Sequence, residues 1–479
     1  MKKILFLLMI LMTVLSLVAC RGETELPQAS GGTQQGPGGT PPDKPSGGPG
    51  GTPPDKPSGG PGGQGGPGGP GGSSGNVTYA ATVEITGTES QSGQSYASAS
   101  ADVSALMVST SEAVTIADPA VTKSGDSNGG DNCNFYGQNA AVLVKGGSTT
   151  TITGGTITSD ATGANGVFCY GGNGGKNGAA GDGTKVIISD TIITTTKGGS
   201  GGIMTTGGGI MEAHNLTVTT SGQSSAAIRT DRGGGTVTVD GGTYTSNGLG
   251  SPAIYSTADI TVSNATLVSN LSEGVCIEGK NSITLTDCDL TANNTKRNGN
   301  AKFLDTIMIY QSMSGDADSG TSVFSMTNGS LTSKNGHVFH VTNTTTVINL
   351  TNVDITNEDA SNVLISVCDD GWSGAKNIAT LNAANQILDG AVLVGSNSTL
   401  TLNLAEGSSL TGYVSGSIKD AGGSTVSSQV GTVNVTLDGT STWTLTADSY
   451  ITSFSGDPAK IKANGYTLYV NGTALAGTD

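Results

Sequence analysis

The chain has 479 residues, a formal net charge of −16 and 77 glycines, and only 4% of its residues are aromatic. Charged residues make up 12% of the chain, about half the fraction of roughly 25% that is usual in globular domains. The acidic balance argues against a nucleic-acid partner, because nucleic-acid binding needs a basic patch. The low aromatic content leaves few side chains for a conventional core, which argues against an ordinary globular enzyme.

Residues 1–19 have the three parts of a secretory signal. Two lysines precede an apolar run over residues 4–15, and the segment leads through Ala19 into Cys20. The apolar run is shorter than the ~20 residues that a membrane-spanning helix needs. A cysteine directly after a small residue resembles the lipobox of bacterial lipoproteins, whose cysteine is lipidated after cleavage. The resemblance implies a lipid on Cys20 that anchors the mature protein to a membrane of a bacterial cell envelope, outside the cytoplasm.

A second segment, residues 20–76, lies between the signal and the repetitive part of the chain. Its residues 31–75 contain 20 Gly and 11 Pro, and residues 40–51 recur unchanged as residues 52–63. This composition cannot bury enough apolar surface to offset the conformational entropy of folding. We therefore predict a disordered tether behind Cys20, which acts either as a spacer with a required reach or as a neutral linker.

After the tether, short stretches rich in Val, Ile and Thr recur along the chain. The apolar residues that mark the units are Ile152, Ile188, Ala213, Val239, Val262, Leu285, Met326 and Leu350. Most steps between them are 23 to 26 residues, and two longer steps point to insertions near residues 171–183 and 293–301. Two positions after each marker stand Gly154, Asp190, Asn215, Gly241, Asn264, Asp287, Asn328 and Asn352. Gly, Asn and Asp tolerate the left-handed backbone conformation, so a tight bend is predicted at one place in every unit.

A coil of about 23 residues with short strands and a fixed bend is typical of a parallel β-helix. We therefore predict an all-β parallel β-helix, with right-handed coiling expected by analogy with known parallel helices. The alternative is a stacked antiparallel sandwich, which would need hairpin turns every 8–12 residues. We assign coils to residues 141–366, an N-terminal cap with the first strands to residues 77–140, and final coils with a C-terminal cap to residues 367–479.

The lipobox, the tether and the coils together resemble bacterial parallel β-helix surface proteins of the pectate-lyase-like superfamily. The similarity covers about residues 130–360 and concerns the pattern of coils, without a family-specific catalytic motif. Non-catalytic polysaccharide-binding lipoproteins and adhesin passengers are the most similar types. The resemblance implies a surface-bound binding protein and says little about its ligand.

A second strand precedes each marker, and its side chains alternate between the interior and the exterior. If Ile228, Ile254 and Ile277 point inward, the residues after such positions form one outward column with a spacing of about 4.8 Å. That column is Lys145, Tyr170, Thr205, Arg229, Tyr255, Glu278, Tyr310 and His340. Tyrosine rings can stack on sugar rings, and the charged side chains can hydrogen-bond hydroxyls or uronate carboxylates. With Trp372 in a predicted loop, the column predicts a site for a polysaccharide or cell-surface glycan, and an ordinary solvated face is the alternative.

Two further functions remain as alternatives to polysaccharide binding. One is an adhesin for proteins or cells. The other is a Ca²⁺-dependent uronate polysaccharide lyase, which the resemblance suggests, with Arg229 or Lys280 as the base and Glu278 or Asp231 as a cation ligand. Such a base needs a lowered pKa and a rigid cluster of carboxylates. The column does not bring three acids together, so we predict no enzyme.

The remaining metal and nucleophile candidates are weak. Asp126, Asn128 and Asp131 offer oxygen ligands for Ca²⁺ but lack the closing Glu of an EF-hand, so we predict no required cofactor. His337 and His340 are three residues apart, which on a strand should place them on opposite faces. The five cysteines beyond the lipobox are an odd number, which argues against a disulfide framework. Threonine runs suggest ice binding, but no regular exposed Thr-x-Thr array is evident in the sequence.

Overall fold

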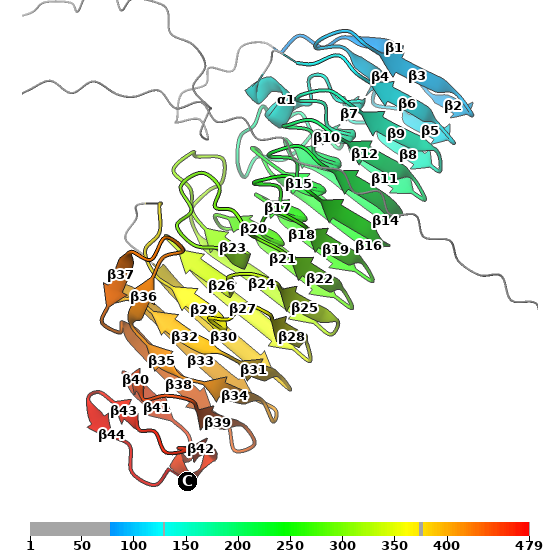
Figure 1. Cartoon of the computed structure of the whole chain (residues 1–479). Coiled ribbons are helices and arrows are strands. Elements are labelled where there is room, and N and C mark those ends of the chain that lie inside the picture. The colour runs from blue at the N-terminus through cyan, green and yellow to red at the C-terminus, as the bar shows by residue number, and fades with distance from the viewer. Residues whose placement is uncertain (1–76, 128–129, 373–376, 479) are drawn as a thin grey trace, which may run out of the picture. The chain divides into compact units, whose positions relative to one another are not determined.

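The computed structural model describes residues 77–127, 130–372 and 377–478, which form a parallel β-helix (Figure 1). Each coil contributes up to three short strands, and equivalent strands of successive coils pair in parallel. This arrangement confirms the predicted fold class and excludes the antiparallel sandwich. The predicted signal, Cys20 and the tether lie outside the described residues.

The first strand of each coil belongs to a 13-stranded parallel sheet, named sheet A here. Its strands are β1 (Ala81–Ile85), β4 (Ser104–Ser109), β7 (Val142–Lys145), β10 (Val167–Tyr170), β13 (Ile203–Thr206), β15 (Ile228–Thr230), β17 (Ile254–Ser256), β20 (Val275–Glu278), β23 (Asp305–Tyr310), β26 (His337–Thr342), β29 (Val363–Val367), β32 (Ala391–Val394) and β35 (Val414–Ser415). Ile203, Ile228 and Ile254 lie side by side on successive coils of this sheet.

The second strand of each coil belongs to a 22-stranded sheet, sheet B. Its second strands are β2 (Glu89–Ser92), β5 (Ala113–Ala117), β8 (Thr149–Thr153), β11 (Lys185–Ser189), β14 (Gly209–Thr220), β16 (Gly235–Ser246), β18 (Asp259–Ser263), β21 (Ser282–Thr286), β24 (Thr321–Thr327), β27 (Thr345–Thr351), β30 (Asn377–Ala384), β33 (Ser398–Ala405), β38 (Thr432–Leu437) and β41 (Ser453–Ser455). The long strands β14 and β16 also supply the third strands of their coils.

The third strands follow the bend. In sheet B they are β3 (Ser95–Ser98), β6 (Ala120–Lys123), β9 (Thr156–Ser159), β12 (Ile192–Thr195), β19 (Thr266–Ser269), β22 (Asp289–Ala292), β25 (Ser330–Ser333) and β28 (Asp354–Asn357). Towards the C-terminus the third place is taken by a separate parallel sheet of β31 (Ile387–Asp389), β34 (Ser409–Gly412), β39 (Thr442–Leu445) and β42 (Ile461–Lys462).

A few elements depart from the coil pattern. Helix α1 (Asp131–Tyr136) lies between β6 and β7, and the 3₁₀ turn η1 (Pro458–Lys460) precedes β42. Strands β36 (Ser417–Lys419) and β37 (Thr425–Ser428) form an antiparallel hairpin. Strand β40 (Ser449–Ile451) pairs in parallel with β43 (Leu468–Val470), which pairs antiparallel with β44 (Thr473–Ala474). No helix of the described residues is long and apolar enough to cross a membrane.

The eight apolar markers of the sequence repeat stack on one another. Ile152 pairs with Ile188, and the register continues without a shift through all the remaining markers to Leu350. The eight predicted bend residues all have φ between 51° and 74°. The bend between the second and third strands is therefore left-handed in each of these coils, as the recurrence of Gly, Asn and Asp predicted.

One continuous hydrophobic cluster fills the interior of the coils from Ile85 to Leu468. Small and β-branched side chains dominate it, because the sheets leave only a narrow space between them. Trp443 and Tyr244 are the largest side chains that are fully buried there. The five cysteines of the described residues are all buried.

The threonine pattern in the sequence has a regularity that the sequence analysis missed. Outward-facing side chains of the third strands form one column through nine coils, and eight of its nine members are threonine. The column is Thr122, Thr158, Thr194, Thr219, Thr245, Val268, Thr291, Thr332 and Thr356. The position two residues earlier varies in type, so Thr-x-Thr pairs occur in only three of these nine coils, at Thr156 and Thr158, Thr217 and Thr219, and Thr243 and Thr245. The unequal lengths of the coils hide the single threonine column in the sequence.

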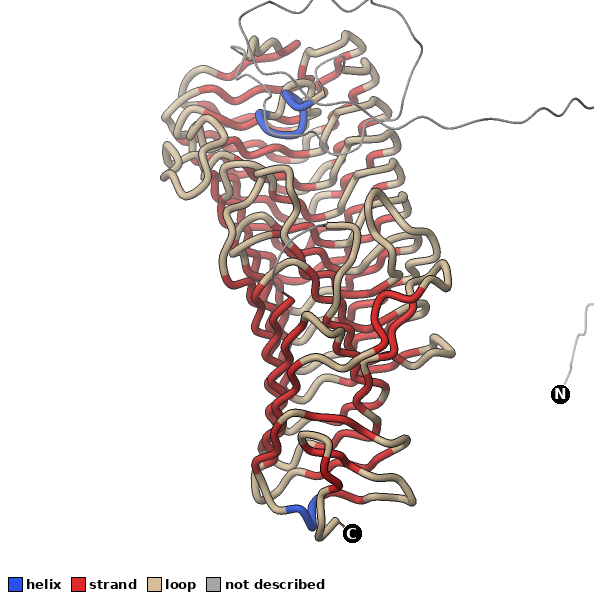
Figure 2. The backbone as a smooth tube through the Cα atoms, turned by 90° about the vertical axis from the view of Figure 1, so that its left-hand side faces the viewer, coloured by secondary structure: helices blue, strands red, loops and turns tan. Residues whose placement is uncertain are grey.

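Long loops leave the coils next to sheet A and lie on the side that faces the viewer in Figure 2. They span residues 124–141, which include α1, and residues 171–184, 293–304 and 311–320. Two of them correspond to the predicted insertions. The loop over residues 311–320 was not predicted, because it lies in the same long step as the loop over residues 293–304.

The left-handed bend offers a direct test of the fold. Asn264 has φ of 55°, and its amide donates to Asp240 Oδ1 at 2.7 Å. Replacing Asn264 with Ala removes this hydrogen bond and places a less tolerant residue in the left-handed region, so we expect a loss of about 1–2 kcal/mol of stability. Asn264→Gly keeps the backbone conformation and should lose less. Urea unfolding of both variants checks this, and an equal loss would contradict the role of the backbone.

Candidate functional site

Strand pairing in sheet A divides the predicted outward column into two. The first column is Arg229, Tyr255, Cys276, Met308 and His340. The second lies two positions further along the strands and contains Lys145, Tyr170, Glu278 and Tyr310. Thr205 belongs to neither, because it pairs with Cys169 and Thr230 at an inward position. The single column was wrong because a shift of two positions preserves the alternation of faces and so leaves no trace in the sequence pattern.

The two columns lie beneath the long loops and are not a solvated face. His340 is fully buried, Glu278 is 1% exposed, and Tyr170 and Tyr310 are each 9% exposed. Phe303 of the loop over residues 293–304 packs against the His340 ring at 4.6 Å. Only the edges of the columns reach solvent, where Arg229, Tyr255, Lys145 and Trp372 are half-buried.

Glu278 is the centre of a buried hydrogen-bond network. Tyr255 and Tyr310 donate to its Oε2, and Ser312 and Ser314 of the loop over residues 311–320 donate to its Oε1. Burial raises the pKa of Glu278, while the hydrogen bonds from Ser312 and Tyr255 oppose the rise. Within the described residues no Lys, Arg or His forms an ion pair with this carboxyl group.

Three aromatic side chains surround this carboxyl group and are called the aromatic cluster here: Tyr255, Tyr310 and Trp372. The Tyr310 and Trp372 rings lie 4.8 Å apart at an angle of 54°. Tyr255 and Trp372 are half-buried and pack against Cys276, Met308 and Tyr310. The cluster therefore presents aromatic surface at the solvent boundary and holds polar hydroxyl groups behind it.

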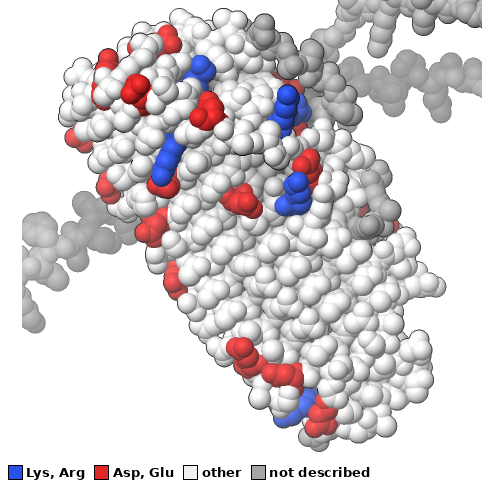
Figure 3. Space-filling view, turned by 180° about the vertical axis from the view of Figure 1, so that it is seen from behind, with Lys and Arg blue, Asp and Glu red and all other residues white. Residues whose placement is uncertain are grey.

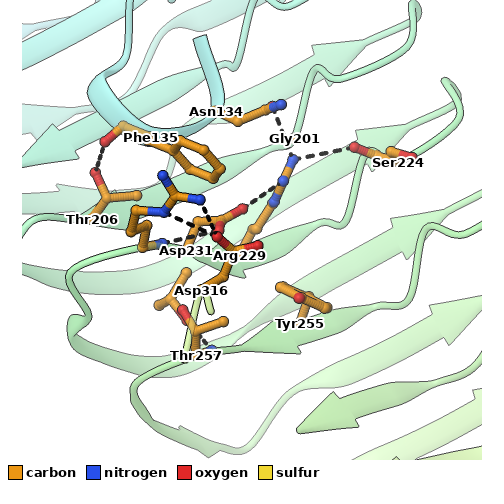
Figure 4. A network of polar contacts seen from close by, with 12 residues as sticks. Asn134, Phe135, Gly201, Thr206, Ser224, Arg229, Asp231, Tyr255, Thr257 and Asp316 are labelled. Atoms are coloured by element: carbon orange, nitrogen blue, oxygen red, sulfur yellow. Dashed lines mark hydrogen bonds and ion pairs between the residues drawn. The ribbon is translucent and has the colours of Figure 1, made fainter. Parts of the chain in front are cut away.

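Two arginines are held by carboxylates: Arg229 of β15, shown in Figure 4, and Arg232, which follows β15. Arg229 Nη2 donates to Asp231 Oδ2 at 2.7 Å, and Arg229 Nη1 reaches Asn134 Oδ1 at 3.4 Å. The Arg229 guanidinium lies 6.0 Å from the centre of the Tyr255 ring. Arg232 donates through Nε and Nη2 to Asp316 Oδ1, at 3.0 and 2.6 Å. The two arginines therefore link three segments of the chain: the loop that contains α1, strand β15, and the loop over residues 311–320.

Asp231 titrates abnormally despite its ion pair. Burial raises the pKa of the Asp231 carboxyl to about 6, and Asp316 adds to the rise while Arg229 opposes it. The side chain is 5% exposed, so the cost of removing its charge from water outweighs the attraction of one neighbouring guanidinium.

The bases considered for a uronate lyase are both engaged in ion pairs. Arg229 is bound to Asp231, and Lys280 Nζ lies 2.9 Å from Asp318 Oδ2. Each of the two side chains is therefore held by a carboxylate of the protein itself.

The predicted Ca²⁺ loop is divided in the structure. Asp126 Oδ1 accepts a hydrogen bond from the Thr162 backbone N–H at 2.8 Å, and Asp131 begins α1. Asn128 lies outside the described residues. In residues 77–127, 130–372 and 377–478, no three His, Cys, Asp or Glu side chains are grouped closely enough to hold a metal ion.

His337 and His340 share a partner, although the strand pattern placed them on opposite faces. The Nδ1 atoms of both rings lie 2.7 Å from Ser366 Oγ, and His340 Nε2 lies 3.0 Å from Asp370 Oδ2. Burial, together with His340, lowers the pKa of His337 to about 3. No pattern in the sequence indicated this group of serine, histidine and aspartate. Ser366 and His340 are fully buried, so the group binds β26 to β29 and offers no nucleophile to a substrate.

A polar groove of about 440 Å³ lies between the loops over residues 171–184 and 311–320. It is lined by glycines and alanines together with polar residues that include Asn177, Asp259, Lys280 and Asp318. The loop approaches the coil closely, since a Cβ atom on Gly181 would lie 2.1 Å from the Gly208 carbonyl oxygen. Sequence analysis did not find this groove, although it noted the glycine-rich insertion that forms one wall.

The pKa of Asp231 predicts a change of stability with pH. The folded state binds this proton more tightly than the unfolded state, whose pKa is near the ordinary 3.8. The stabilisation of the folded state by this bound proton is fully present below pH 3.8, and it is lost as the pH rises to about 6. We expect the unfolding midpoint to fall over this range, and Asp231→Asn to flatten the profile. Urea unfolding between pH 3.5 and 7 checks this, and identical profiles would contradict it.

Comparison with known proteins identifies no relative of this chain. No family model, no curated protein and no solved structure matches the chain. The fold therefore rests on the observed strand pairing, and any function must be argued from the geometry of the site.

Proposed function

We propose that the protein is a non-catalytic polysaccharide-binding protein whose site is the aromatic cluster with its surrounding polar groups. The observation that carries the proposal is the half-buried Trp372 and Tyr255 beside Tyr310, with Glu278 behind them. Aromatic faces pack on the C–H surfaces of pyranose rings, while buried polar groups fix orientation through hydrogen bonds. Both kinds of group occur together here.

The form of the solenoid favours a polymer over a small ligand. Successive coils present equivalent positions at a spacing of about 4.8 Å, close to the length of one sugar ring. Gly233 and Ala317 of the polar groove directly follow Arg232 and Asp316 in the chain, and Lys280 lies two positions after Glu278. A glycan chain bound at the aromatic cluster can therefore meet further polar surface beside it, as extended ligands do on other solenoids.

We also propose a place for the chain among the surface β-helices of the pectate-lyase-like superfamily. Three strands per coil, the left-handed bend after the second strand and the long loops over sheet A support this assignment. The proposal concerns architecture.

The test of polysaccharide binding is retention on insoluble glycans. Trp372→Ala should weaken retention about tenfold, since an aromatic contact of this kind contributes roughly 1–3 kcal/mol. Tyr255→Ala should act in the same direction. Tyr450→Ala is the matched control, because Tyr450 is 45% exposed and stacks on Tyr469 in the C-terminal coils. Equal retention of all variants, or no retention of the unaltered protein on any glycan, would reject the site.

We propose a bacterial cell envelope as the location, with the lipid on Cys20 as the anchor. The support is the sequence of the first 20 residues alone. Cys20→Ala should move the protein from the membrane fraction to the soluble fraction and abolish incorporation of labelled fatty acid. Fractionation of a bacterial host with and without the substitution checks this, and an unchanged membrane fraction would contradict the anchor.

A further inference from the structure

Three cations at the proposed glycan site are each paired with a carboxylate of the protein. Arg229 is bound to Asp231 at 2.7 Å, Arg232 to Asp316 at 2.6 Å, and Lys280 to Asp318 at 2.9 Å. The first two pairs are largely buried, with side chains that are 5% to 23% exposed. A buried pair resists separation, because parting it leaves an uncompensated charge in a poorly solvated place.

The fourth carboxyl group at the site has no cation. Glu278 is held by four hydroxyl groups and by no Lys, Arg or His of the described residues. Asp259 of the groove is a further carboxyl group, so the carboxyl groups at the site outnumber these three cations, and the whole chain carries a net charge of −16. Figure 3 shows one face of the molecule, on which basic and acidic residues are scattered and most of the surface is uncharged.

A ligand carboxylate would meet unfavourable conditions here. To reach Arg229 or Arg232 it would have to displace Asp231 or Asp316 from an existing ion pair. Placed elsewhere at the site, it would approach the Glu278 carboxyl group without a compensating cation. A hydroxyl-bearing ring meets neither obstacle, because it can exchange hydrogen bonds with the tyrosine and serine hydroxyl groups and pack on Trp372.

We infer that the site selects uncharged glycans and rejects uronate polysaccharides, and that Asp316 and Asp231 are the residues that set this specificity. The inference rests on the proposed polysaccharide-binding function and deepens it. Asp316 is the better residue for a test, since its partner Arg232 is the more exposed of the two arginines, at 23% against 13%. Without Asp316, the freed Arg232 guanidinium becomes a ligand for carboxylates.

The experiment compares neutral insoluble polysaccharides with the same polymers oxidised at C6 to uronates, using the full-length lipoprotein in detergent at low ionic strength. The unaltered protein should bind a neutral polymer and bind its oxidised form at least tenfold more weakly. Asp316→Asn should raise severalfold the ratio of binding to the oxidised form over binding to the neutral form, because the freed Arg232 guanidinium can pair with a uronate carboxylate. Asp420→Asn is the control, because this half-buried carboxylate is distant in sequence and accepts hydrogen bonds from the backbone of its own turn.

Each outcome decides a separate point. Equal or tighter binding of the oxidised polymer by the unaltered protein overturns the inference and leaves the polysaccharide-binding function intact. No binding to any polymer in either form overturns the proposed function itself. The comparison of the two polymers requires no variant, so the inference can be rejected even if Asp316→Asn fails to fold.

Discussion

Hydrogen bonding between successive coils in parallel register is the constraint on which the rest of the structure depends. Each strand of sheets A and B pairs with the equivalent strand of the next coil, so a residue has its counterpart directly above and below it. A bend at a different place in one coil would interrupt the pairing on both sides. The left-handed residue therefore recurs at the same position, as Asp190, Asn215 and Asn264 illustrate. Some of their side chains also bond across coils, such as Asn215 to Asp190 at 2.8 Å.

The same constraint decides where variation can occur. The interior accepts only side chains that fit the narrow space between the sheets, which explains the predominance of Val, Ile, Leu and Ala in the core. Extra residues can enter only between strands, and the longest insertions leave the coils next to sheet A. The loops that they form cover the outer face of that sheet, and polar side chains on this face become buried.

Burial of polar groups must be matched by hydrogen bonds, because an unpartnered group loses its interactions with water. Glu278 satisfies this requirement through four hydroxyl groups, and Arg229 through Asp231, Asn134 and Ser224. The group of Ser366, His340 and Asp370 does so without access to solvent. Residue types that are common in active sites thus hold loops onto a sheet here. The surface beside them is an aromatic and hydroxyl-rich edge, where Arg229 and Arg232 are each paired with a carboxylate.

The sequence by itself determined the coil length, the eight stacked markers, the left-handed bends and two of the insertions, because each of these depends on residues close together in the chain. Only the tertiary structure decided which outward residues share a column and which of them reach solvent. Arg229 meets Asn134 across 95 residues, and Arg232 meets Asp316 across 84. Such contacts depend on how loops of irregular length fold back over the sheet, and no local period in the sequence encodes that.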